Sequence, residues 1–236
     1  MPEGTTFAFV AFAAGLGVFH TLIGPDHYLP FVMIARARNW SLWRTGVLTC
    51  ICGLGHVLSS VALGFLGITA VVAMEKIAYL EGARGSLAAW MIIAIGLLYM
   101  VWGLRKAVRG KSHTHGHMHA DGPAHRHEHA HFGGHTHVHA KGKSITPWVL
   151  FIVFVFGPCE VLIPTLMIPA AQHNYAAVAL IATVFGIATI GTMLLMVILA
   201  THGLKLIRLG PMERYSHVIA GGVIAASGLA MKFLGL

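Results

Sequence analysis

The sequence predicts an all-α membrane protein with about six transmembrane helices. The prediction rests on three observations: 56% of the residues are hydrophobic, only 10% are charged, and long stretches carry no charge at all. Soluble globular proteins carry roughly 25% charged residues, so this chain has too few to cover a water-facing surface. The composition therefore excludes a soluble enzyme, and it also excludes disorder of the whole chain.

Six apolar stretches are long enough to cross a bilayer, which takes roughly 20 helical residues. They cover residues 4–23 (extending as far as 34), 45–72, 86–104, 145–170, 175–201 and 217–236. The first stretch lacks the basic n-region of a signal peptide, so we count it as a span. We expect a multi-pass protein whose main partner is the lipid bilayer.

The basic residues predict the orientation of these spans. Most of the 16 Lys and Arg residues fall in three connecting segments, 24–44, 105–143 and 202–215. The positive-inside rule places these segments in the cytoplasm and both termini outside. The basic excess is then explained by a membrane surface rather than by nucleic acid, and we expect the protein in the cytoplasmic (inner) membrane.

A histidine-rich tract joins the third and fourth spans. Its composition offers no apolar core, so we expect it to be disordered without a ligand. Neutral imidazole is a common ligand for zinc, copper, nickel and cobalt ions, which makes this loop a candidate metal-binding segment. The other interpretation is a low-complexity linker with incidental metal affinity. The eleven histidines of the tract are His113, His115, His117, His119, His125, His127, His129, His131, His135, His137 and His139.

Two stretches of the chain share one pattern. Gly24-Pro25-Asp26-His27 ends the first span, and Gly157-Pro158-Cys159-Glu160 lies inside the fourth. An offset of three spans, an odd number, predicts two three-helix halves of inverted topology. We therefore predict a first repeat over 1–109, a His-rich cytoplasmic loop over 110–144 and a second repeat over 145–236.

The prolines of this pattern predict broken helices at spans one and four. Proline lacks an N–H and clashes with the carbonyl four residues earlier, so Pro25 and Pro158 should free the carbonyls of Thr21 and Phe154. Irregular backbone at membrane depth is tolerated only against protein or a watery cavity.

Ionisable and metal-ligating side chains gather at these breaks. Such groups are costly at membrane depth and usually functional, so we predict a transition-metal site near the midplane. For any single residue the alternative is a plain kink or a hydrogen bond between helices. The candidate ligands are His20, Asp26, His27, His56, Cys159 and Glu160, and Gly24, Pro25, Gly157 and Pro158 form the breaks.

The arrangement His20-x5-Asp26-His27 resembles the signature of the nickel/cobalt transporter family. In that signature four residues separate the histidine from the Asp-His pair, whereas five separate them here. The internal histidine-rich loop resembles the nickel/cobalt efflux branch, and the layout resembles the urease-accessory-type permeases and the wider lysine-exporter superfamily. The resemblance implies a permease for nickel or cobalt, with Asp26 and His27 matching the signature pair and His20 matching loosely. Nickel and cobalt, with zinc also open, would then be cargo, and no tightly bound cofactor is expected.

Two other functions remain open on the sequence. A membrane thiol-disulfide conduit would need Cys159 to pair with Cys50 or Cys52, which we interpret as packing residues. A small-anion exporter of the sulfite or organosulfonate type should have Arg or Lys along its path, and the predicted spans hold almost none. We expect a permease and not an enzyme, working by alternating access with possible proton coupling. Resemblance to the efflux branch gives a slight preference for export.

Overall fold

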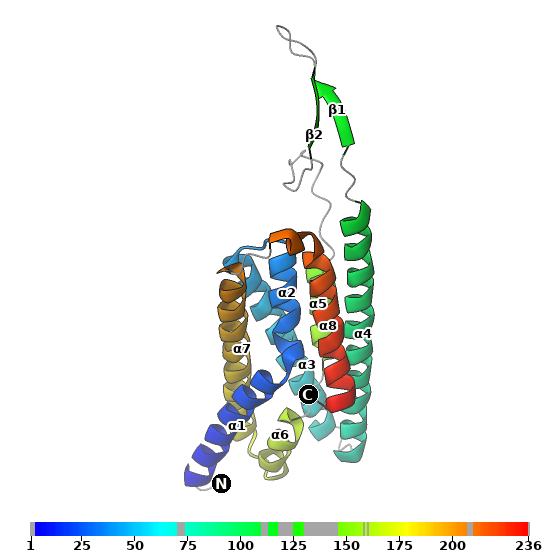
Figure 1. Ribbon diagram of the computed structural model, residues 1–236. Helices are drawn as coiled ribbons and strands as arrows, with labels where there is room; N and C mark the ends of the chain where they lie inside the picture. The colour runs from blue at the N-terminus through cyan, green and yellow to red at the C-terminus, as the bar shows by residue number, and fades with distance from the viewer. Residues whose placement is uncertain are drawn as a thin grey trace.

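The computed structural model describes residues 3–69, 74–109, 113–117, 125–129, 146–157, 159, 161–206 and 210–235. It is a bundle of helices with one short hairpin projecting from an end (Figure 1). In chain order the elements are α1 (Glu3–Ile23), the 3₁₀ turn η1 (Pro25–His27), α2 (Leu29–Ala37), α3 (Leu42–Thr69), α4 (Met74–Arg109), β1 (His113–His117), β2 (His125–His129), α5 (Thr146–Phe156), α6 (Leu162–Ala171), α7 (Tyr175–Leu206), the 3₁₀ turn η2 (Gly210–Tyr215) and α8 (Ser216–Leu234).

Four helices among the described residues are long and apolar enough to cross a membrane. Their outward faces carry large hydrophobic side chains, as lipid-facing surfaces do: Ile187 of α7 is 68% exposed and Leu98 of α4 is 71% exposed. Three shorter apolar helices accompany them. The protein is therefore membrane-embedded and, apart from the hairpin, built from helices. The four long segments are Leu42–Leu66, Lys76–Val108, Tyr175–Leu204 and Met212–Leu234, and the shorter ones are Phe7–Ile23, Thr146–Phe156 and Leu162–Ala171.

The two predicted helix breaks are present in the structure. Helix α1 ends at Ile23, where the N–H of Gly24 still donates to the carbonyl of His20 at 3.0 Å, and α2 begins only at Leu29. In the second half α5 ends at Phe156 and α6 begins at Leu162. Each break follows a Gly-Pro pair in the sequence, as expected from the missing proline N–H.

Helix α4 is much longer than the predicted third span. It begins at Met74, twelve residues before the expected start, and takes in Glu81 and Arg84. These charges suggested a loop, but they form an ion pair with each other three residues apart inside the helix. Opposite charges at this spacing lie on one helix face, so they neutralise each other within the bundle.

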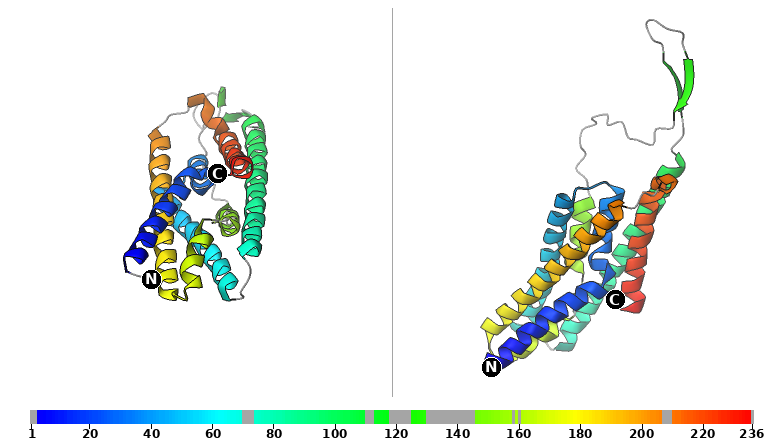
Figure 2. Two further views of the ribbon diagram at one scale, coloured as in Figure 1. Left: turned by 90° about the horizontal axis from the view of Figure 1, so that it is seen from below. Right: turned by 60° about the vertical axis from the view of Figure 1, so that its left-hand side comes forward.

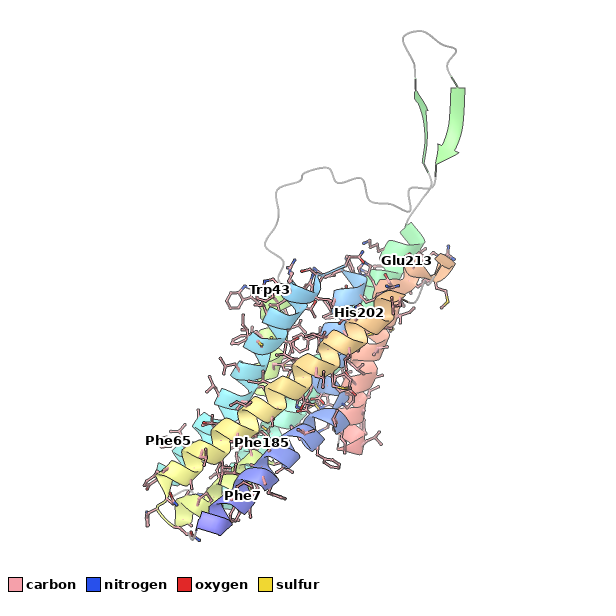
Figure 3. The ribbon with its side chains drawn as sticks, turned by 90° about the vertical axis from the view of Figure 1, so that its left-hand side faces the viewer. Phe7, Trp43, Phe65, Phe185, His202 and Glu213 are labelled. Carbon is pink, nitrogen blue, oxygen red and sulfur yellow. The ribbon has the colours of Figure 1, made fainter. Side chains whose placement is uncertain are left out.

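The helix packing brings distant parts of the chain side by side. Helix α4 packs along α8, α1 packs along α7, and α3 packs against α5 and α7. Figure 2 shows α1 and α7 running together across the molecule. In Figure 3, Phe7 and Phe65 lie toward one end of the bundle, while Trp43 and Glu213 lie at the end from which the hairpin projects.

The histidine-rich tract is not wholly irregular, which corrects the expectation of a disordered loop. Strands β1 and β2 pair antiparallel, and His113, His115 and His117 lie opposite His129, His127 and His125 in the register. The two strands pair through backbone hydrogen bonds, which do not require an apolar core. The composition of the tract therefore could not predict this pairing. His119, His131, His135, His137 and His139 lie outside the described residues.

Candidate metal centre

Three of the predicted ligands meet inside the bundle. His20 comes from the last turn of α1, His27 from η1 and His56 from α3. The ring centroids of His20 and His27 are 4.6 Å apart, and those of His27 and His56 are 5.1 Å apart. One ligand atom from each residue lies within 4.8 Å of the other two. His56 is near the middle of α3, so about 20 Å of helix lies on either side of the cluster.

The three rings share an unusual feature. The Nε2 atoms of His20, His27 and His56 are all buried and have no hydrogen-bond partner among the residues that the structure describes. An unpaired buried polar atom normally costs about 1–3 kcal/mol, so three at one place call for a ligand. A divalent transition metal, which neutral imidazole binds through this nitrogen, matches the donor set.

The break after α1 orients His27. Its Nδ1 lies 3.2 Å from the carbonyl oxygen of Gly24 and 3.2 Å from Oδ1 of Asp26. Both oxygens are acceptors, so Nδ1 carries the proton and donates it, which leaves the Nε2 lone pair for a metal ion. A histidine bonded in this way to a carboxylate is a typical outer-shell arrangement of metal sites. Asp26 is thus placed behind a ligand rather than among the three converging rings.

The second break orients His56 in the same manner. Its Nδ1 lies 3.3 Å from the carbonyl oxygen of Phe154, one of the carbonyls predicted to be freed by Pro158. A carbonyl only accepts, so His56 also directs an unprotonated Nε2 into the cluster. At each break a main-chain carbonyl oxygen therefore accepts a hydrogen bond from a histidine ring and orients it.

Glycine is required at both positions by close contact. A Cβ on Gly24 would lie 2.9 Å from Oδ1 of Asp26, and a Cβ on Gly157 would lie 3.0 Å from Nδ1 of His56. Real Cβ atoms are not found closer than about 3.0 Å to such neighbours. The ring positions of His27 and His56 thus depend on Gly24 and Gly157 having no side chain.

The cluster is slightly too wide for simultaneous coordination. Two nitrogens bound at about 2.1 Å can be at most about 4.2 Å apart, even on opposite sides of an ion. The histidine ligand atoms lie within 4.8 Å of one another. Coordination by all three rings therefore requires their nitrogens to approach one another slightly, which small side-chain rotations can supply.

A partly open cavity of about 300 Å³ borders this cluster. His20, Asp26 and His27 line it together with residues of α4 and α8, Val161 and Gly235. Lys232 of α8 is among them and donates a hydrogen bond to Ser86 of α4 at 2.6 Å. The site is therefore reachable, and the route to it passes a fixed positive charge.

The second sequence motif contributes differently from what we expected. Cys159 is fully buried in an apolar cluster with Leu162, Leu166 and Phe185, and it is not part of the histidine group. Its position right after a helix break suggested a ligand, but a break does not determine which way the next side chain points. Glu160 and Pro158 lie outside the described residues.

Sequence reasoning missed two charged residues that hold this second break. Arg84 donates to the carbonyl oxygens of Val155 at 2.9 Å and Gly157 at 3.4 Å, while Glu81 accepts the N–H of Cys159 at 3.3 Å. The pair thus satisfies main-chain groups on both sides of the break. Glu81 is only 2% exposed. Opposite charges three residues apart beside an apolar stretch were the available signal.

Arg84 also links the break to the histidine cluster. It donates to Oγ of Ser59 at 2.8 Å, and Ser59 in turn donates to the carbonyl oxygen of His56 at 2.8 Å.

Searches against protein-family models, curated proteins and solved structures find no match to this chain.

Proposed function

We propose that the chain is a membrane permease for divalent transition-metal ions, with nickel and cobalt as the cargo and export as the direction. The observation that carries the proposal is the convergence of three buried Nε2 atoms, from His20, His27 and His56, at two helix breaks, where none of them has a partner within the described part of the chain. Buried ionisable residues at membrane depth are expensive, and they mark ion pathways. The resemblance of the His-Asp-His segment to the nickel/cobalt transporter family supports the choice of ion.

The packing of the helices supports an architecture of two inverted halves. If α1 with α2 corresponds to α5 with α6, then α3 corresponds to α7 and α4 to α8. Two pairs of contacts follow this relation, since α1 packs on α7 where α5 packs on α3, and α2 packs on α7 where α6 packs on α3. The six spans are then α1–α2, α3, α4, α5–α6, α7 and α8. Broken helices beside a midplane site are the usual arrangement in transporters built this way.

The mechanism we propose is alternating access around the three histidines. A histidine binds metal only when its ligating nitrogen is unprotonated, so protons compete with the ion for the same atoms. Binding draws the three histidine nitrogens together around the ion, and we propose that this approach couples the ion to movement of the helices that carry them. Flux should therefore depend on a pH gradient, and collapsing that gradient at a fixed voltage should lower it.

Vesicle assays test ion, direction and site together. Purified protein is reconstituted, and uptake of nickel, cobalt and zinc is followed separately in right-side-out and inside-out vesicles. His56→Gln should abolish the flux that wild-type protein supports, while His202→Gln, a histidine of α7 outside the cluster, should keep it. Flux that persists in His20→Gln, His27→Gln and His56→Gln alike refutes the proposed site.

The structure favours neither of the alternative functions. Cys52 and Cys159, two of the free cysteines, are buried in separate apolar clusters, which does not suit thiol exchange. The cavity that reaches the histidines contains one lysine beside a carboxylate and two imidazoles, a lining that suits a cation better than an anion.

A further inference from the structure

A second cavity, of about 640 Å³, lies at the end of the bundle where the hairpin leaves. It is lined by the connection between α2 and α3 and by residues from α3, α4 and α8. It shares no lining residue with the cavity that reaches the histidines. Its lining residues are Ala37, Arg38, Asn39, Trp40, Ser41, Arg44, Trp102, Lys106 and His217.

The lining of this second cavity is strongly basic. Arg38, Arg44 and Lys106 come from three different elements, and no carboxylate is among the lining residues that the structure describes. Each cationic group lies over an aromatic ring: Arg44 is 4.8 Å from the Trp40 centroid, Lys106 is 5.4 Å from that of Trp102, and Arg38 is 6.0 Å from that of Tyr99. The cation–π contacts of Arg44 and Lys106 hold these long side chains at the cavity without removing their charge.

A short hydrogen-bond chain in the cavity wall determines which nitrogen of His217 carries the proton. Lys106 Nζ lies 3.2 Å from Nε2 of His217, and Nδ1 of His217 lies 2.8 Å from the hydroxyl of Tyr99. An ammonium group only donates, so Nε2 accepts and His217 is neutral, with its proton on Nδ1. The ammonium group of Lys106 has three N–H donors, and His217 accepts one of them.

The neighbouring side chains place the cavity at the membrane surface. Trp43, next to the lining residue Arg44, is 82% exposed and lies at this end of the bundle (Figure 3). Trp102, which lines the cavity, is 47% exposed, and Val108 in the next turn of α4 is 72% exposed. Tryptophan is enriched at the boundary between hydrocarbon and headgroups, so the cavity opens at headgroup level.

We propose that this cavity binds the phosphate-bearing headgroup of an anionic phospholipid. Arg and Lys donors from three elements converge on it, and such donors bind phosphate through charge-assisted hydrogen bonds. Its volume exceeds that of a phosphate ion and leaves room for a glycerol headgroup. Basic pockets between membrane helices on the cytoplasmic side are known to bind such lipids. The bound headgroup would join the α2–α3 connection, α4 and α8, and this holds whatever ion the protein carries.

Native mass spectrometry of the full-length protein tests this proposal. Phosphatidylglycerol, phosphatidylcholine and soluble glycerol 3-phosphate are added separately to the detergent-solubilised protein. Wild-type protein should retain phosphatidylglycerol in preference to phosphatidylcholine. The Arg44→Gln/Lys106→Gln variant should bind it about tenfold more weakly, because two charge-assisted contacts are lost. The matched control Arg105→Gln/Arg214→Gln removes two positive charges at the same end outside the cavity, and it should bind as wild type does.

Three results would overturn the proposal. Equal weakening in both double variants would show that only overall charge matters. Equal retention of phosphatidylcholine and phosphatidylglycerol by wild-type protein, a comparison that needs no variant, would show that the cavity does not select anionic headgroups. Displacement of phosphatidylglycerol by an equal concentration of glycerol 3-phosphate would identify a soluble phosphate compound as the ligand instead.

Discussion

The imidazole of His56 and the carbonyl oxygen of Phe154 are 3.3 Å apart, although 98 residues separate them in the chain. His56 belongs to the first half of the sequence and Phe154 to the second. A candidate ligand in one half is therefore oriented by the helix break of the other. Binding of the proposed metal ion at His56 would therefore be linked to the relative position of the two helix breaks through this hydrogen bond.

Substitution Gly157→Ala should disturb this link directly. The added Cβ would lie 3.0 Å from Nδ1 of His56 and 3.2 Å from the carbonyl oxygen of Phe154, so it would displace the ring. Loss of an outer-shell contact of this kind typically costs about 10–100-fold in metal affinity. Calorimetric titration with nickel measures the change. Gly191→Ala in α7, where a Cβ meets nothing within 4 Å, serves as the control and should bind normally.

Substitution Asp26→Asn should weaken metal binding without abolishing it. The carboxylate accepts a hydrogen bond from Nδ1 of His27, and its charge strengthens the ligand on the other side of the ring. An amide keeps the shape and loses the charge, so we expect affinity to fall by about tenfold or more. Titration of Asp26→Asn beside His27→Gln distinguishes the two roles: equal loss in both would mean that Asp26 itself binds the ion.

Substitution Arg84→Gln should destabilise the fold. It leaves Glu81 buried without its cation and leaves the carbonyl of Val155 without its donor. Breaking a buried ion pair from one side costs about 3–5 kcal/mol. Thermal unfolding followed by tryptophan fluorescence should show a lower midpoint. The double variant Glu81→Gln/Arg84→Gln should recover part of the loss, and a double variant less stable than Arg84→Gln would contradict this explanation.

Substitution Lys232→Gln should ease the entry of cations. Lys232 lines the cavity that reaches His20 and Asp26, and its charge opposes a divalent ion there. We expect the apparent KM for nickel to fall several-fold, with a smaller effect at high salt. Lys232→Arg retains the charge and should behave as wild type. An unchanged KM in the Gln variant would exclude this cavity as the route.

Deletion of residues 113–139 should leave maximal flux intact. Strands β1 and β2 of this tract project from one end of the bundle (Figure 1), and the chain on either side remains joined when residues 113–139 are removed. Its histidines can gather ions near the pathway, so we expect a weaker apparent affinity instead. Concentration-dependent flux in vesicles measures both quantities. A deletion variant that inserts normally and carries no metal would overturn this view of the loop.

The sequence was most informative where proline chemistry decides the structure. Pro25 and Pro158 cannot continue a helix, so both breaks could be predicted with the carbonyl of Phe154 among the freed groups. The rings of His20 and His27 contact each other even though the helix is interrupted between them at Gly24. A continuous helix was therefore not needed to bring them together.

Side-chain direction at the breaks could not be predicted. Cys159 follows Pro158 in the sequence, but its thiol lies among apolar residues while its N–H contacts Glu81. From composition alone, the charges of Glu81 and Arg84 argue against a membrane helix at this place in the sequence. In the bundle they cancel each other and replace main-chain hydrogen bonds that the break removes. Such compensation depends on a neighbouring helix, and one segment of sequence does not contain it.

The contact between α4 and α8 has a consequence for how the bundle can move. A Cβ on Gly103 would lie 2.8 Å from backbone atoms of His217 and Val218, and one on Gly228 would lie 2.9 Å from side-chain atoms of Ile92 and Ile93. Backbones this close pack together without side chains between them. Because α4 and α8 close the two proposed halves, we expect this pair to move as one unit and to keep the halves joined. The interrupted helices should then turn against this pair during transport, with α3 and α7 following them.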